Sequence, residues 1–155
     1  MVRAHRVILF SGLLLLAAYL LGLFGPPPAG KREVKPATDA ESMAFVEKLV
    51  ESLVKLQNQQ KICQDCKVKY LAHPDPPAID KGQKETEKLF KMLDKERLWL
   101  TQEEEDADKR WTETTRLTLK RFRELAAEWR GEATKIEAQA TALRKFWEAE
   151  KAKNR

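Results

Sequence analysis

The chain contains few of the residues that carry chemistry. Its only histidines are His5 and His73, and its six glycines form no Gly-rich phosphate loop. No arrangement of Ser, His and Asp stands out either. Acid–base catalysis and nucleotide binding usually depend on such groups. The sequence therefore predicts a protein that is not an enzyme and that carries no cofactor.

The chain also lacks runs of alternating β-branched residues, whereas 34% of its residues are charged. This composition is typical of long polar helices and predicts an all-α fold. The asparagines, Asn58 and Asn154, begin no Asn-x-Ser/Thr motif. A domain outside the cytoplasm would therefore carry no N-linked glycan.

Charge is absent from residues 7–24, which read VILFSGLLLLAAYLLGLF. As a helix this segment would be about 27 Å long, close to the roughly 30 Å hydrocarbon core of a bilayer. A short basic tail, residues 1–6, precedes it. We therefore expect a single N-terminal transmembrane helix, with the lipid bilayer as a partner.

Two other interpretations of residues 7–24 stay open. A cleaved secretory signal would leave a mature N-terminus near residues 26–30, although no small-x-small cleavage site follows cleanly. A mitochondrial presequence with an anchor is compatible with the late first acidic residue, Glu33. Basic residues flank both ends of the segment, and the short tail favours a cytoplasmic N-terminus. The helical domain would then lie in a lumen, outside the cell or in an intermembrane space.

A Pro-rich linker, residues 25–37, separates the apolar segment from the first predicted helix, residues 38–72. Three consecutive prolines favour a stiff polyproline II conformation in this linker. Thr38 with Glu41 three residues later forms a capping box, which predicts the helix start. The helix carries a broad apolar stripe that comprises Phe45, Val46, Leu49, Val50, Leu53, Val54, Leu56, Ile62, Cys63, Cys66, Tyr70 and Leu71.

A Pro-rich turn, residues 73–79, should end this helix, because HPDPP removes three backbone donors. Asp80 and Gln83 form a second capping box, which predicts a long helical arm over residues 80–153. A third box at Thr101 offers a break, but continuity is favoured. The expected architecture is thus a long helical hairpin or coiled coil.

The arm has a clear apolar stripe near its C-terminal end. A continuous helix over residues 101–153 would be about 80 Å long, against roughly 48 Å for the first helix. Part of the stripe would then stay uncovered and would need a protein partner or a second copy. The predicted partner-binding residues are Phe122, Leu125, Trp129, Ile136, Leu143 and Trp147. Alternatively, the arm folds back on residues 80–100 into a closed three-helix bundle.

Cys63 and Cys66 lie three residues apart on one face of the first helix. A disulfide within the pair or between two copies is one interpretation, although a regular helix strains an i,i+3 bridge. A thioredoxin-like redox pair needs a helix N-terminus after a strand, which is missing. A metal site completed by His73 needs a ligand beyond the helix end. The remaining interpretation is two half-buried thiols on an apolar stripe.

Two basic segments with aromatic residues, 109–111 and 120–123, resemble a nucleic-acid strip only superficially. Glu113 and Glu124 interrupt them, so the basic charge does not gather on one face. The net charge of +5 lies mostly in residues 1–35. We therefore expect no nucleic-acid partner.

These patterns together predict a membrane-anchored coiled-coil scaffold or accessory subunit that organises or stabilises a membrane protein assembly. Two alternatives remain. One is a thiol-based redox or metal-linked protein that uses Cys63 and Cys66. The other is a secreted helical factor released by signal cleavage.

Overall fold

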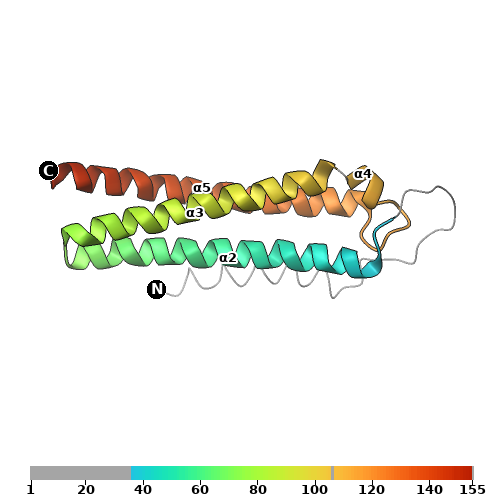
Figure 1. Cartoon of the computed structure of the whole chain (residues 1–155), viewed down its shortest axis with the longest axis horizontal. Coiled ribbons are helices and arrows are strands. Elements are labelled where there is room, and N and C mark those ends of the chain that lie inside the picture. The colour runs from blue at the N-terminus through green and yellow to red at the C-terminus, as the bar shows by residue number, and fades with distance from the viewer. Residues whose placement is uncertain (1–35, 106, 155) are drawn as a thin grey trace. The chain divides into compact units, whose positions relative to one another are not determined.

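A computed structural model describes residues 36–105 and 107–154 of the chain (Figure 1). In these ranges the chain forms helices and no strand, which confirms the all-α prediction there. The helices are α2 (Asp39–Ala72), α3 (Pro76–Glu105), α4 (Ala107–Arg110) and α5 (Leu119–Lys153).

None of the helices in the described ranges is both long enough and apolar enough to cross a membrane. The transmembrane segment predicted at residues 7–24 lies outside these ranges, as do the tail 1–6 and most of the linker 25–37.

The start of α2 is held by the capping box predicted from the sequence. The hydroxyl Oγ1 of Thr38 accepts a hydrogen bond from the backbone N–H of Glu41 at 3.2 Å. In return, the Glu41 carboxylate accepts from the backbone N–H of Thr38 at 2.6 Å. Two donors that the first turn leaves without helical partners are thereby satisfied. The hydrogen bond from Thr38 N–H lowers the pKa of Glu41.

The helix expected to open at Asp80 begins earlier, at Pro76. The prediction was wrong because Pro76 and Pro77 occupy the first turn, where a missing N–H breaks no helical hydrogen bond. Asp80 and Gln83 do not cap the helix. Their side-chain oxygens both accept from Nζ of Lys151 on α5, at 2.9 and 3.0 Å.

The arm predicted as continuous over residues 80–153 is broken between α3 and α5. After α4, residues 111–118 are not helical, and the new helix starts with Thr118 as its cap, accepting from the Arg121 N–H at 3.3 Å. Thr115 stabilises the break, because its hydroxyl contacts the carbonyls of Thr112 and Leu117 at 2.6 and 2.5 Å. Such local bonds from threonine compete with helix formation.

The described residues divide into two compact units. The first, here called the aromatic unit, contains residues 36–50 and 107–123. Its core is a ring cluster: Phe45 lies 5.5 Å from Trp111 and 4.8 Å from Phe122 between centroids. Trp111 and Phe122 stack at 5.6 Å. Within this unit the backbone N–H of Ala37 donates to the carbonyl of Arg110 at 2.9 Å.

The second unit, here called the main bundle, contains residues 51–105 and 124–154. Cross-helix contacts define its topology. Tyr70 on α2 donates to Glu150 on α5, while Trp129 of α5 lies beside Ser52 of α2. The helices α2 and α5 therefore run parallel. Lys151 pairs with Asp80, and Arg130 of α5 pairs with Glu104 near the end of α3, so α3 runs antiparallel to α5.

The core of the main bundle is apolar and comes from all three helices. Its buried side chains recur at helical spacing, which places them on one face of each helix. They include Leu53, Leu56, Cys63 and Tyr70 of α2; Ile79, Leu89, Leu93 and Leu100 of α3; and Leu125, Trp129, Ala133, Ile136, Ala140, Leu143 and Trp147 of α5. The hairpin with a long free arm is therefore replaced by a closed three-helix arrangement.

Candidate functional site

The six residues predicted to bind a partner are core residues. Phe122, Leu125, Trp129, Ile136, Leu143 and Trp147 are each at most 6% exposed. The premise that this stripe stays uncovered is wrong, because the break at residues 111–118 returns α5 alongside α3. Trp129 also satisfies its indole N–H inside the main bundle, donating to Oγ of Ser52 at 2.7 Å. A partner, if it binds, must use another surface.

The two cysteines are free thiols inside α2. Cys63 is fully buried, and the Gln59 amide nitrogen lies 3.9 Å from its sulfur. Burial raises the pKa of both the Cys63 and the Cys66 thiol. A raised pKa disfavours the thiolate, which is the form that attacks disulfides and binds metals. In the described ranges no group of three His, Cys, Asp or Glu side chains is placed to hold a metal.

Gln59 is a buried polar residue that the sequence patterns did not single out. Its amide donates to the Glu85 carboxylate at 2.7 Å and to the Glu85 carbonyl at 3.1 Å. A buried amide must find such partners, because an unmade hydrogen bond in the core costs about 1–3 kcal/mol. This contact therefore favours one register of α2 against α3.

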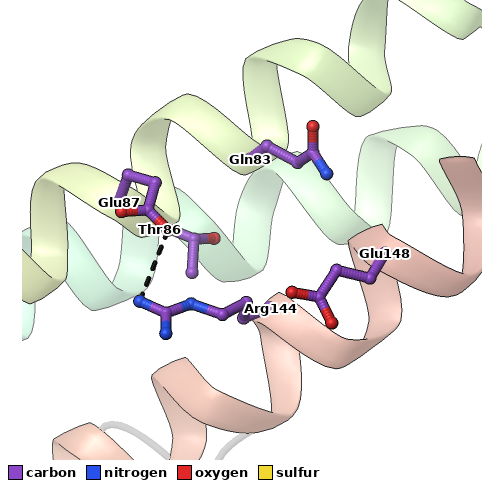
Figure 2. A pocket seen from close by; sticks show the side chains of 5 residues that line it. All are labelled: Gln83, Thr86, Glu87, Arg144 and Glu148. Atoms are coloured by element: carbon purple, nitrogen blue, oxygen red, sulfur yellow. Dashed lines mark ion pairs between the residues drawn. The ribbon is translucent and has the colours of Figure 1, made fainter.

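A small polar pocket of about 220 Å³ lies between α3 and α5 (Figure 2). Arg144 dominates it: the guanidinium lies 3.3 Å from a Glu87 carboxylate oxygen and 3.7 Å from the centroid of the Phe90 ring. The Thr86 hydroxyl donates to the Gly82 carbonyl of its own helix at 2.8 Å. Figure 2 shows Gln83 and Glu148 completing the lining. The Thr86 hydroxyl is engaged and Arg144 pairs with Glu87, although Nε of Arg144 has no hydrogen-bond partner among the described residues. The pocket is better explained as a cross-helix packing contact.

The outward side of α2 is unusual, because large apolar side chains are exposed on it. Val54, Ile62, Val68 and Leu71 are 46, 44, 65 and 60% exposed. The remaining large exposed apolar residue in the described ranges is Leu98 of α3. We call the exposed residues Val54, Lys61, Ile62, Asp65, Val68 and Leu71 the outer face of α2.

Sequence reasoning did not separate this outer face from the core stripe. Val54, Ile62 and Leu71 all fell within the apolar stripe predicted for the first helix. A stripe that wide exceeds what two neighbouring helices can cover. In the main bundle Leu53 and Tyr70 point inward, whereas Val54 and Leu71 remain exposed. The width of the stripe was the signal that could have revealed a second surface.

Charge on the outer face is also distinctive. Val54, Lys61 and Val68 follow one another at intervals of seven, so they lie along one line of the helix. Lys61 and Asp65 are exposed, and neither makes an ion pair with any residue that the structure describes. The face therefore combines apolar side chains with a cation and an anion four residues apart, and Lys69 is a further exposed cation beside Val68.

Comparison with protein-family models, with curated proteins and with solved structures finds no match to this chain.

Proposed function

We propose that this chain is a membrane-anchored helical scaffold or accessory subunit. Residues 7–24 hold it in the bilayer, and the outer face of α2 binds a protein partner. The membrane assignment is supported by the length and lack of charge of the apolar segment.

The observation that carries the binding part is the exposure of four large apolar side chains on one helix. Single exposed apolar residues are ordinary, but a group of them along one helix is typical of a surface that meets another protein. Here Val54, Ile62, Val68 and Leu71 lie within eighteen residues of α2. Val54 and Val68 lie along one line of the helix, which a partner helix would cover, and Ile62 and Leu71 lie on either flank of that line.

The thiol alternative has weaker support, because Cys63 is buried and both thiols have a raised pKa. The secreted alternative depends on cleavage after residues 7–24 and is decided by experiment. Intact-mass measurement of the native protein gives its N-terminus, and alkaline extraction of membranes tests the anchor. We expect an uncleaved chain that resists extraction.

A matched variant tests whether the anchor depends on the apolar segment. Leu14→Lys with Leu15→Lys places two charges near its centre, at about 2.5–3.5 kcal/mol each on insertion scales. We expect this variant to leave the membrane fraction. A mature N-terminus near residues 26–30 in the wild type would instead overturn the anchor.

Partner binding is tested by a photo-crosslinking amino acid in place of Val68, in the full chain in its native membrane. The control places the same amino acid at Leu98, which is 60% exposed against 65% for Val68 but lies on α3. We expect a crosslinked adduct from position 68 and none from position 98. No adduct at position 68, or equal adducts at both positions, would overturn the role of the outer face.

A further inference from the structure

We infer that the partner on the outer face of α2 is a second copy of this chain, with the two α2 helices antiparallel. The inference rests on the proposed function, since it names the partner of the surface proposed above. It is carried by the charges on that surface.

The charge pattern is self-complementary in one orientation only. Consider a twofold axis that passes the exposed side of α2 at the level of residue 63. Positions 61 and 65 are each two residues from this level, so position 61 of each copy lies opposite position 65 of the other. Lys61 of each copy then meets Asp65 of its partner. A parallel, in-register pair would instead place Lys61 against Lys61 and Asp65 against Asp65. Opposed like charges disfavour an interface, so antiparallel pairing is selected.

The apolar residues fit the same axis. Position 54 meets position 72, so Val54 lies against the small exposed Ala72 at each end of the contact. Position 58 meets position 68, so Val68 lies at the level of the exposed Asn58 of the other copy. Ile62 is one residue from the axis, so it lies near the centre of the contact between the two helices. A contact between Val54 and Ala72 therefore lies beyond the charge pairs at each end.

The size of the contact indicates how it works. Two single helix faces bury less than the roughly 1,200–2,000 Å² of stable complexes. Such a dimer is weak for freely diffusing molecules. Confinement of both copies to one membrane raises their effective concentration, which favours the weak contact without any additional surface. A chain anchored in the membrane provides this confinement.

Charge reversal tests the pairing directly. The full chain is studied in detergent micelles by sedimentation, with circular dichroism to check folding. Lys61→Asp gives two anions per face and Asp65→Lys gives two cations, so each variant alone should dimerise at least about tenfold more weakly than wild type. An equimolar mixture of the two should form heterodimers, since every opposed pair is then attractive. Lys95→Asp on the exposed side of α3 is the control and should dimerise as wild type does.

Three other outcomes would contradict, in turn, the second copy, the antiparallel arrangement and the partner surface. Wild type that stays monomeric up to high micromolar concentrations, with an adduct at position 68 that contains a different protein, overturns the second copy and leaves the proposed function standing. Wild-type dimers with no recovery in the mixture overturn the antiparallel arrangement. An absent adduct at position 68 overturns the proposed partner surface itself.

Discussion

The indole of Trp147 lies directly against the backbone of Gly82. A Cβ atom built on Gly82 would be only 2.3 Å from Cε2 of Trp147, far inside van der Waals contact. Trp147 is fully buried, so its ring cannot swing away into solvent. The absence of a side chain at position 82 therefore allows α3 and α5 to pack closely at this point.

We expect Gly82→Ala to destabilise the chain by about 1–3 kcal/mol, the usual range for overpacking a core. The matched control is Gly131→Ala, because a Cβ there meets no atom of the described residues within 4 Å. Alanine is the better helix former, so the control should gain about 0.5–1 kcal/mol. Urea unfolding followed by circular dichroism measures both, and a stabilised Gly82→Ala would contradict the packing described.

The bond between Ser52 and Trp129 gives a second prediction. Ser52→Ala removes the acceptor of a buried indole N–H and should cost about 1–3 kcal/mol. Ser42→Ala is the control: its hydroxyl is also buried but has no hydrogen-bond partner in the part of the chain that the structure describes. That change should lie within about 0.5 kcal/mol of wild type. Equal losses in the two variants would show that the indole bond contributes nothing.

The ion pair of Arg97 and Glu137 predicts how stability depends on pH. The guanidinium donates two hydrogen bonds, at 3.0 and 2.6 Å, and these lower the pKa of the Glu137 carboxyl. A carboxyl with a lowered pKa stabilises the fold at pH values above its ordinary pKa of 4.5. This contribution is lost as the pH falls through the folded-state pKa.

Glu137→Gln should therefore destabilise the chain at pH 7, by less than about 1 kcal/mol because solvent screens the half-exposed pair. At pH 3 the difference from wild type should be smaller. Urea midpoints at the two pH values make the comparison. Glu148→Gln removes an exposed carboxylate of the same helix and controls for the loss of one negative charge. A Glu137 variant with the same loss at both pH values would rule out the linkage.

The two thiols should differ in reactivity. Cys63 is fully buried, whereas Cys66 is partly exposed, and burial raises the pKa of both. We expect a maleimide to modify Cys66 of the folded protein at least about tenfold faster than Cys63, which must wait for an opening of the bundle. In urea the two rates should converge. Mass spectrometry of the labelled peptides locates each modification, and rapid labelling of Cys63 in the native state would contradict its burial.

Local signals predicted the boundaries of α2. Thr38 with Glu41 marked its start, and the prolines after His73 marked its end at Ala72. Both signals act within one turn of helix, so a sequence reveals them without tertiary information.

The long-range features of the fold were not predicted, and the reasons for this are also physical. The break before α5 depends on Thr112, Thr115 and Thr118, whose hydroxyls bond nearby backbone groups instead of continuing a helix. In a helix without that break, the stripe with Trp129 and Trp147 has no neighbour to cover it. Periodicity shows that a helix has an apolar face, but which element covers that face depends on where the chain turns.

The parallel arrangement of α2 and α5 has a consequence for folding. Gln59 meets Glu85 across 26 residues of sequence, whereas Tyr70 meets Glu150 across 80. Contacts between distant residues form later, since a longer loop must first be closed. We therefore expect α2 and α3 to pair before α5 packs on them, and until then the surface that buries Trp129 and Trp147 stays open to water. A partly folded chain of this kind exposes the apolar surface that a chaperone binds or that drives aggregation.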